Sequence, residues 1–392
     1  MFSKIIATGS FVPDTVVTND DLAGIMDTSD EWIRTRTGIR ERHVFSAEDR
    51  ERTITAALKA CEQALERASK KGFEREEIEL VIAATSTPDY MFPATACVLT
   101  DRLHIGPAAA FDISLACTGF LAAFSTAAAY LGSGMYKHAL IVGVDVMSKL
   151  MDPNDRSTSI LFGDGAGAVV LSADERFREF AESGLIRSML KSDGSRSQVL
   201  SCEALYGGLG LSEAAGKAAL AASDSADAEA FPDKDKGPSL SFEDGRTGPG
   251  ISGSVASCGA GPYKAPEKAE GTGEGPEPGR IYMNGRAVFE FAVREVPKLI
   301  ATLLSEAGEG AEPKYYVLHQ ANYRIIEAVA KRLKAPMDKF PCNIEHYANT
   351  TAATIPMLLD ELSEGGRLKD GDLIVMSGFG AGLSLGAMLF RW

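Results

Sequence analysis

The chain has 392 residues, of which 45% are hydrophobic and 24% are charged. This length allows two cores of ordinary size, and the hydrophobic fraction excludes wholesale disorder. With 40 basic and 54 acidic residues the formal net charge is −14, which disfavours nucleic acid and anionic lipid as main partners. There is no apolar run of about 18 residues and no signal-peptide pattern, so we expect a cytoplasmic protein without a membrane span.

The first half of the chain predicts alternating helices and strands. A helix begins near Asn19, with Asn or Asp as its cap. Apolar residues at helical spacing predict a long helix over 51–70, and small residues predict another over 119–131 that ends at Gly132 and Gly134. Short apolar runs favour strands at residues 4–8, 80–85, 112–115, 139–144 and 168–171.

Residues 201–280 differ from the rest of the chain in composition. They hold 15 of the 39 glycines and 7 of the 17 prolines. We interpret the stretch at about 200–280 as an insertion into the second half. A surface loop, a lid over a pocket and a partner-binding element are all compatible with it, and its composition favours a flexible loop.

The second half repeats the pattern of the first. Strands are expected at 315–318, 373–377 and 385–390, and helices at 287–303, 323–333 and 351–362, with Pro297 marking a start or a kink. A strand-to-helix junction at Cys117 follows the strand ending at 85 after 32 residues. The junction at Asn349 follows the strand ending at 318 after 31 residues. This spacing suggests two similar halves in a layered α/β architecture.

Cys117 stands where a predicted strand meets a predicted helix. The six cysteines include no C-x-x-C pair, which indicates reduced thiols, one of them a candidate nucleophile. The helix N-terminus favours the Cys117 thiolate, and the residue's own N–H is placed to bind an oxyanion. On its local context alone, a small buried hydrophobic residue is the more common role for a cysteine such as Cys117.

His319 and Asn349 are the other candidates for chemistry. His319 follows a strand at its carboxyl end, where α/β sheets usually place functional groups, although a buried structural histidine fits too. Asn349 opens a helix and is by itself typical of an N-cap. The strings Gly163–Gly167 and Gly378–Gly382 favour tight turns that bring backbone near a ligand over a phosphate cradle. The five histidines are scattered, and no metal site is predicted.

Taken together, these strings resemble the β-ketoacyl-[acyl-carrier-protein] synthase III family of the thiolase superfamily. The resemblance covers the chain except roughly 200–280, and it implies a homodimer with a thiolase fold. In that fold two similar halves, 1–180 and 181–392, form a five-layer α-β-α-β-α arrangement. The matching strings are Asp30–His43, Ala116–Phe120, Phe162–Gly167, His319–Asn322, Asn349–Ala353, Ile355–Pro356 and Gly378–Gly382.

The resemblance also implies a catalytic triad of Cys117, His319 and Asn349. Cys117 would take an acyl group, most simply acetyl, from acyl-coenzyme A. A decarboxylative Claisen condensation with malonyl-acyl carrier protein would then initiate fatty acid biosynthesis. The backbone N–H groups of Cys117 and Ala381 would bind the oxyanion, although relatives usually have glycine in place of Ala381. The two thioesters are substrates, and no cofactor or metal is implied.

Contacts with the substrates follow from the same resemblance. Trp32, Arg36 and Arg156 match positions that bind coenzyme A. Phe379 matches an acyl-pocket residue, and Phe92 matches one that closes the acyl pocket of the partner subunit.

Arg324, Lys331 and Arg332 match or accompany a basic face that docks the acidic carrier protein. Glu290 departs from the pattern, because relatives commonly carry a lysine there. Two alternatives remain open. One is a related condensing enzyme of polyketide or other secondary metabolism with a different primer or acceptor. The other is a non-catalytic, acyl-binding member of the superfamily.

Overall fold

The computed structural model of the chain describes residues 3–177, 183–204, 278–308 and 311–392. Most of the predicted insertion, residues 205–277, lies outside this description, and so does the choice between loop, lid and partner-binding element.

The first half builds a five-stranded sheet in the order β1-β7-β6-β4-β5. In this sheet β4 runs parallel to β5 and β6, whereas β7 runs antiparallel to β1 and β6. The strands are β1 Lys4–Phe11, β4 Leu80–Ala84, β5 Ala109–Ile113, β6 His138–Val146 and β7 Asp164–Ser172.

The second half builds a four-stranded sheet in the order β11-β12-β13-β8. The pair β11 and β12 is parallel, and the pairs β12 with β13 and β13 with β8 are antiparallel. This repeats the order and direction of β4, β6, β7 and β1, which confirms the two similar halves, while β5 has no counterpart among the described residues. The strands are β8 Gly184–Ser192, β11 Tyr315–Leu318, β12 Leu373–Gly380 and β13 Ser384–Arg391.

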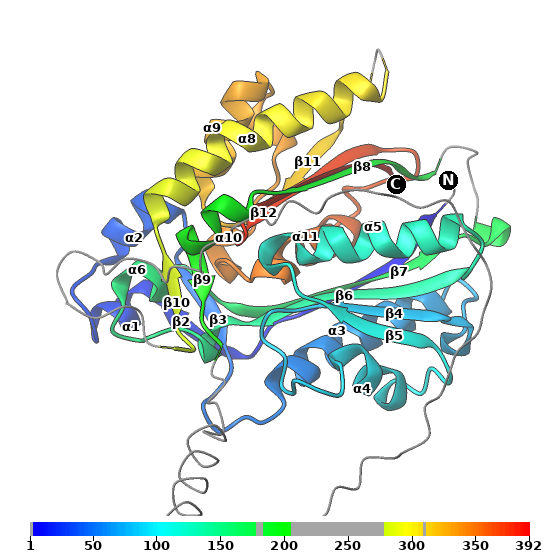
Figure 1. Cartoon of the computed structure of the whole chain (residues 1–392), viewed down its shortest axis with the longest axis horizontal. Helices are drawn as coiled ribbons and strands as arrows, with labels where there is room; N and C mark the ends of the chain where they lie inside the picture. The colour runs from blue at the N-terminus through cyan, green and yellow to red at the C-terminus, as the bar shows by residue number, and fades with distance from the viewer. Residues whose placement is uncertain (1–2, 178–182, 205–277, 309–310) are drawn as a thin grey trace, which may run out of the picture. The chain divides into compact units, whose positions relative to one another are not determined.

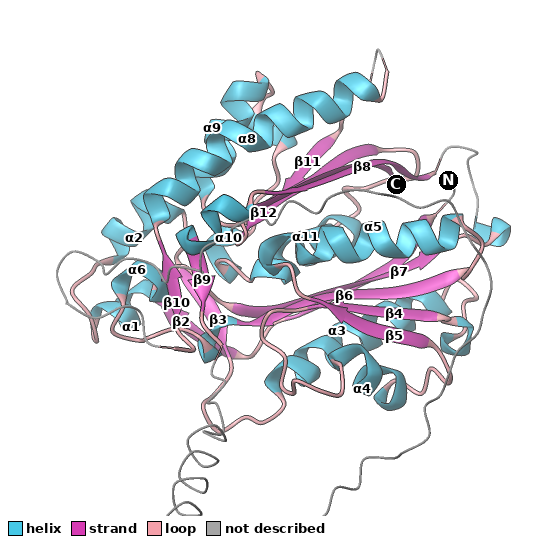
Figure 2. Ribbon diagram, viewed as in Figure 1, coloured by secondary structure: helices cyan, strands magenta, loops and turns pink. Residues whose placement is uncertain are grey.

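Helices cover and separate the two sheets (Figure 1). α3 and α4 pack on the outer face of the first sheet, α5 and α11 lie between the sheets, and α8 and α9 cover the outer face of the second (Figure 2). This is the predicted α-β-α-β-α layering. The helices are α3 Arg52–Ser69, α4 Thr95–Arg102, α5 Gly119–Gly132, α8 Gly285–Glu306, α9 Tyr323–Leu333 and α11 Thr354–Glu364.

Smaller elements surround the edge of the sheets where Cys117 lies. They include a pair of strands before the long helix α3 and a second pair, β9 and β10, on either side of residues 205–277. Their bounds are β2 Thr15–Thr18, α1 Asn19–Ala23, α2 Asp30–Thr37, β3 Glu41–Val44, α6 Arg156–Ser159, β9 Leu200–Cys202, β10 Ile281–Met283 and α10 Ile344–Tyr347.

α5 is buried on almost every side because it lies between two sheets. Phe120 and Phe124 are fully buried and share a core cluster with Ile82 of the first sheet and Met388 of the second. A helix that is apolar all round is stable only in such a position. The small residues that we read as a helix therefore also fix where Cys117, two residues before α5, must lie.

Two predicted details of the elements are wrong. α1 is capped by the Thr18 hydroxyl, which accepts from the Asp21 N–H, while the Asp21 carboxylate accepts from the Thr18 N–H. This reciprocal capping box satisfies two backbone N–H groups at the helix start. Of the two alternatives for Pro297, the helix start is wrong because Pro297 lies inside α8, and the kink stays a prediction.

The glycine-rich strings lie mostly in strands, and a tight turn is formed only at residues 381–383, where Gly382 has a φ of +134°. Gly165 and Gly167 lie in β7, and Gly378 and Gly380 lie in β12. A Cβ on Gly167 would lie 2.6 Å from the backbone nitrogen of Met357, so glycine lets α11 approach the sheet closely. We expected these glycines to let the backbone come close to a ligand. In β7 they let helix α11 come close to the sheet instead.

Candidate active site

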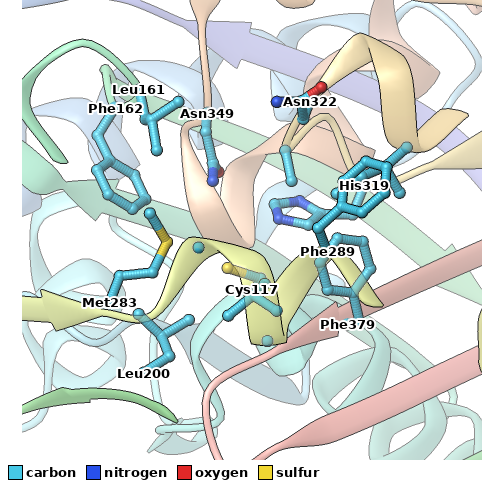
Figure 3. Close-up of a pocket in the computed structure, with 15 residues that line it drawn as sticks. Cys117, Leu161, Phe162, Leu200, Met283, Phe289, His319, Asn322, Asn349 and Phe379 are labelled. Carbon is cyan, nitrogen blue, oxygen red and sulfur yellow. The ribbon is translucent and has the colours of Figure 1, made fainter. Parts of the chain in front are cut away.

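Cys117, His319 and Asn349 line one pocket and point into the same space (Figure 3). They come from the turn before α5, the end of β11 and the turn before α11. The cavity has a volume of about 120 Å³. Its other lining residues are mostly apolar: Leu161, Phe162, Leu200, Met283, Gly285, Val288, Phe289, Ala321, Asn322, Ile325, Phe379 and Gly380.

Cys117 is held by a sharp turn between β5 and α5. The preceding residue, Ala116, has a φ of +44°, a left-handed conformation that turns the chain tightly. The Thr118 hydroxyl, next in the chain, lies 2.9 Å from the Leu115 carbonyl and 2.8 Å from the Ser384 hydroxyl oxygen. The turn is therefore tied to β13 of the other half, and Cys117 keeps a fixed place in the pocket.

The thiol of Cys117 is protonated at neutral pH. Burial raises its pKa to about 12, and the negative charge of Asp145 acts in the same direction. The side chain is only 6% exposed, and this loss of hydration acts against the effect expected of the helix N-terminus. That the helix N-terminus favours the thiolate stays a prediction.

His319 presents a single nitrogen to the pocket. Its Nδ1 lies 2.7 Å from the Thr354 hydroxyl, whereas its buried Nε2 has no hydrogen-bond partner among the described residues. Phe379 packs against the imidazole in a T-shaped arrangement with ring centroids 5.5 Å apart. Burial lowers the pKa of His319 to about 3, so the ring is neutral at physiological pH.

Asn349 turns its amide nitrogen toward the pocket because its amide oxygen is already engaged. The oxygen accepts from the backbone N–H of Thr351 at 2.9 Å. The residue does not open a helix directly, since α11 starts at Thr354 after a short 3-10 turn. Asp145 holds that turn by accepting from the Thr351 hydroxyl and from the Ala352 N–H.

Gly380, the residue before the one expected to bind the oxyanion, lies directly beside Cys117. A Cβ on Gly380 would lie 3.0 Å from the Cys117 nitrogen, and Gly380 lines the pocket. Ala381 follows the end of β12 and is not a lining residue. Its role, and that of the Cys117 N–H, stays a prediction.

The three residues expected to bind coenzyme A lie together. The guanidinium carbons of Arg36 and Arg156 lie 4.4 Å and 4.8 Å from the centre of the Trp32 ring. Arg156 also donates to the Asp27 carbonyl at 2.7 Å. Cation–π contacts therefore gather an aromatic face and two positive charges in one place.

Phe92 lies apart from the pocket of its own chain. Its side chain is 83% exposed, and that of Met91 is 67% exposed. The loop that carries them is nevertheless anchored, because Lys149 pairs with Asp89 at 2.6 Å and Tyr90 donates to Glu51 at 2.7 Å. The structure thus presents two apolar side chains on a fixed loop.

The predicted carrier-docking residues lie on α9. Arg324 is in its first turn and Lys331 and Arg332 are in its last, and all three are exposed. On the neighbouring α8, Glu290 pairs with Arg286 at 2.8 Å. The departure at Glu290 is therefore accompanied by a positive charge one turn away.

Sequence reasoning missed two residues that shape the triad. Thr354 contacts the His319 ring, and Gly380 allows β12 to pass beside Cys117. Thr354 stands between two of the strings that carry the family resemblance, and Gly380 lies inside a third. Their places in those strings were a signal, but only the contacts reveal their roles.

Metal and membrane features do not emerge from the described part of the chain. No group of three or more His, Cys, Asp or Glu side chains in it is arranged to hold a metal ion. None of its helices is both long and apolar enough to cross a membrane.

Comparison with known proteins places the chain in a family. The family model described as 3-oxoacyl-[acyl-carrier-protein] synthase III matches residues 111–194, and the model of its C-terminal part matches residues 306–392. The chain is 37% identical over 390 residues to the β-ketoacyl-[acyl-carrier-protein] synthase III of Clostridium acetobutylicum, covering 99% of this chain and 98% of that protein.

Solved structures agree with this assignment. The crystal structure of 3-oxoacyl-[acyl-carrier-protein] synthase III from Aquifex aeolicus matches with a TM-score of 0.76 and 34% identity over 100% of both chains. A priming β-ketosynthase from a polyketide pathway matches with a TM-score of 0.75 and 27% identity over 100% of this chain and 96% of that one. The chain belongs to the β-ketoacyl-[acyl-carrier-protein] synthase III family and has its thiolase fold.

Proposed function

We propose that this chain is a β-ketoacyl-[acyl-carrier-protein] synthase III that initiates fatty acid biosynthesis. It would join an acyl-coenzyme A primer, most simply acetyl-coenzyme A, to the malonyl group of a carrier protein. The observation that supports the proposal is the pocket lined by the Cys117 thiol, by the Nε2 of His319, which has no hydrogen-bond partner among the described residues, and by the amide nitrogen of Asn349. A nucleophile beside two hydrogen-bond donors is what thioester chemistry requires.

The first step transfers the acyl group to Cys117. Its sulfur attacks the thioester carbonyl carbon, the bond from that carbon to the coenzyme A sulfur breaks, and the thiol proton leaves with free coenzyme A. The tetrahedral oxyanion is stabilised by backbone N–H groups beside Cys117. Splitting the condensation into two steps lowers the barrier of each.

The second step uses the malonyl thioester. Carbon dioxide leaves, and the electrons of the broken C–C bond form an enolate whose oxygen accepts from His319 and Asn349. The enolate carbon attacks the acyl carbon, the Cys117 sulfur leaves, and solvent supplies the proton that restores the thiol. The two thioesters supply every reacting carbon, and loss of carbon dioxide supplies the driving force, so the reaction as written uses no cofactor.

The coenzyme A site is proposed around Trp32. An adenine ring that stacks on the indole would take the place of Arg36 or Arg156, and the displaced guanidinium would pair with phosphate. Replacing Trp32 with Ala should raise the KM for acyl-coenzyme A and leave the KM for malonyl-carrier protein unchanged. A rise in both would contradict a site specific for coenzyme A.

The carrier protein is proposed to dock on α9. Its exposed Lys331 and Arg332 suit an acidic partner of a chain with net charge −14. Reversing both charges to Glu should raise the KM for malonyl-carrier protein, while acylation by acyl-coenzyme A stays unchanged. Lys70→Glu, at the residue that follows the distant helix α3, is the control for charge alone, since that lysine is 68% exposed. An equal effect of this control would reject docking on α9.

A homodimer is proposed in which Phe92 reaches the acyl pocket of the partner subunit. The support is an exposed phenylalanine on a loop that is anchored at Asp89 and Tyr90. Met91, the preceding residue, is 67% exposed, and adjoining exposed apolar side chains are typical of a surface that a partner covers.

The assay that tests the function supplies acetyl-coenzyme A and malonyl-acyl carrier protein and detects acetoacetyl-carrier protein by mass spectrometry. We expect this product with the wild type, and no acyl-enzyme with Cys117→Ser. Product only with another primer or acceptor would favour a role in secondary metabolism. The 37% identity to a synthase III, against 27% to the polyketide enzyme, supports the fatty acid role.

A further inference from the structure

The side chain of Asn349 can present either end of its amide to the pocket, and the nitrogen is the end that points there (Figure 3). The backbone of the residue is fixed, because its N–H donates to the Leu161 carbonyl at 2.9 Å and its carbonyl accepts from the Gly163 N–H at 3.1 Å. The amide itself could still turn over. Among the described residues, the hydrogen bond that prevents this comes from the Thr351 N–H to the amide oxygen at 2.9 Å. The orientation of the amide therefore depends on the backbone at Thr351.

Thr351 has an unusual backbone conformation. Its φ is +50°, in the left-handed region, although the residue is β-branched. A β-branched residue is strained in this region and stays there only when the surrounding structure holds it. The residue is also almost fully buried, with 4% of its surface exposed. We therefore looked for the group that holds it.

That group is the carboxylate of Asp145, which lies on β6 in the other half of the fold. Its Oδ2 accepts from the Thr351 hydroxyl and from the backbone N–H of Ala352, the latter at 3.2 Å. One oxygen thus fixes both the side chain of Thr351 and the peptide group that follows it. These two bonds set the left-handed conformation from outside the turn.

The carboxylate of Asp145 is itself fixed through its other oxygen. Oδ1 accepts from the Ser86 N–H at 2.7 Å and from the Thr87 hydroxyl at 3.1 Å. The Thr87 hydroxyl in turn accepts from the Val146 N–H at 2.8 Å, so its own proton is free for Asp145. Each carboxylate oxygen thus accepts from a backbone N–H. An amide in place of the carboxylate would set its NH2 group against one of them.

We propose that Asp145 is a positioning residue that, through Thr351, keeps the amide nitrogen of Asn349 turned toward the substrate. Asp145 holds Thr351 in the left-handed conformation, and the Thr351 N–H holds the amide oxygen of Asn349. Without the carboxylate, Thr351 relaxes and its N–H moves away. The amide can then present its oxygen, which repels the enolate oxygen. The consequence for the reaction, though not the conformation at Thr351, rests on the proposed function.

The second step of the proposed reaction should depend on Asp145 far more than the first. Asn349 donates to the enolate oxygen in the second step, whereas acylation uses the Cys117 thiol and backbone N–H groups. Burial, and after it the negative charge of Asp145, raises the pKa of the Cys117 thiol. Removing that charge therefore does not make the thiol harder to ionise. General damage to the pocket, by contrast, would slow both steps.

The kinetic test compares the two steps in Asp145→Asn. This variant should slow condensation with malonyl-carrier protein by about 10- to 100-fold and should not slow acylation of Cys117 by acyl-coenzyme A. The matched control is Thr350→Val, which removes a neighbouring buried hydroxyl whose hydrogen-bond partner is the Met357 sulfur at 3.5 Å. Equal slowing of both steps by Asp145→Asn, or an equal loss of condensation in Thr350→Val, would overturn the positioning role.

Substitutions at Thr351 give a test that a merely structural role would not pass. Glycine adopts a positive φ without strain and keeps the N–H, whereas valine keeps the β-branch and loses the hydroxyl. Thr351→Val should therefore slow condensation about 10-fold more than Thr351→Gly does. In the Asp145→Asn background, Thr351→Gly should raise the rate of condensation by about the same factor. Equal rates for the glycine and valine variants, or no rescue by glycine, would reject the proposal.

Crystal structures of the variants report the conformation at position 351 whatever the activity. In Asp145→Asn we expect Thr351 outside the left-handed region and its N–H no longer bonded to the Asn349 amide oxygen. An unchanged Thr351 in this variant overturns the proposal. If Asp145→Asn does not fold, the two single substitutions at Thr351 decide the question. Absence of any condensation product with the wild type would count against the proposed function alone.

Discussion

At the scale of single residues, the pocket depends on how closely its strands approach Cys117. Gly380 lies so near that a methyl group there would meet both the backbone nitrogen and the Cβ of Cys117, at 3.0 Å and 3.1 Å. Neither atom can move easily, because the turn is tied to β13 through Thr118 and Ser384. The glycine is therefore a requirement of packing at the reacting atom.

Gly380→Ala should leave the fold intact and slow acylation of Cys117 by about 100-fold, because a shift of the nucleophile by a fraction of an ångström spoils its approach. Single-turnover acylation with labelled acyl-coenzyme A measures the rate. Gly194→Ala is the matched control, since a Cβ there meets nothing within 4 Å. Equal rates for Gly380→Ala and the wild type would refute the close contact.

The burial of His319 makes the stability of the protein depend on pH. Its pKa is about 3 in the folded chain and near its ordinary value of 6.5 in the unfolded chain. Between these values the unfolded chain binds a proton that the folded chain does not, so the free energy of unfolding falls as the pH falls.

Urea unfolding between pH 7 and pH 4 should therefore give a smaller loss of stability for His319→Gln than for the wild type. Below pH 6 the free energy of unfolding of the wild type should fall faster than that of the variant, by about 1.4 kcal/mol per pH unit. If the free energies of unfolding of the two proteins changed in parallel with pH, the folded chain would take up the His319 proton as readily as the unfolded chain, and the pKa would not be lowered.

At the scale of elements, α11 connects the two halves. It belongs to the second half, yet its Asp360 accepts from Thr8 and Ser10 of β1 at 2.7 Å and 2.6 Å, and pairs with Arg67 of α3 at 2.5 Å. The carboxylate is almost fully buried, so its partners depend on it for their hydrogen bonds. This network fixes the helix whose first residue contacts His319.

Asp360→Ala should destabilise the protein by about 3 kcal/mol, because it leaves Arg67 and two hydroxyls without their shared acceptor. Lys70→Ala, at the residue that follows α3, is the control. It removes a pair with Glu66 in which both side chains are about 70% exposed, and its effect should stay below about 0.5 kcal/mol. Chemical denaturation measures both, and a loss for Asp360→Ala no larger than the control's would contradict the network.

The strands β9 and β10 bring the ends of the inserted segment together. Cys202 pairs with Ile281 in the ladder, and the Gly279 N–H donates to the Glu203 carbonyl at 2.8 Å. A segment that leaves and returns at neighbouring points can change in length with little effect on the rest of the fold.

Replacing residues 205–277 with a short Gly-Ser turn should therefore keep the melting temperature within a few degrees of the wild type, as measured by calorimetry. Loss of folding would show that the segment contributes to the core. In the same variant, unchanged primer preference and carrier affinity would count against a lid.

At the scale of the whole molecule, the proposed dimer makes a prediction that no single chain can satisfy. Cys117→Ala and Phe92→Ala should each be poorly active, the first without a nucleophile and the second with an unclosed acyl pocket. A mixed dimer has one pocket with both Cys117 and the partner's Phe92 intact. When the two variants are mixed and their subunits exchange, each dimer that contains both chains should recover about half of the activity of a wild-type dimer.

The exposure of Phe92 sets the control for this experiment. Because the side chain is 83% exposed in its own chain, Phe92→Ala should not lower the stability of the subunit. Analytical ultracentrifugation reports the oligomeric state of each variant. A wild type that sediments as a monomer, or variants that do not complement, would reject the shared pocket.

The sequence alone determined the order of most elements and the identity of the candidate triad. Buried strands and helices leave local periodicities, as in the apolar run of β4 and the small-residue pattern of α5. The chemistry requires particular residue types in short strings, which is why Cys117, His319 and Asn349 could be named before any contact was known. The repeated spacing even indicated the two similar halves.

Only the tertiary structure decided the ionisation of the thiol, the environment of His319 and the closeness of Gly380 to Cys117. Each depends on groups far apart in the chain, such as Asp145, which lies 206 residues from its partner Thr351. Burial also opposes one local expectation, because the loss of hydration at Cys117 raises the pKa of the thiol that the helix N-terminus was expected to lower. Local patterns carry no information on such contacts, since hydration and electrostatics depend on the whole packed core.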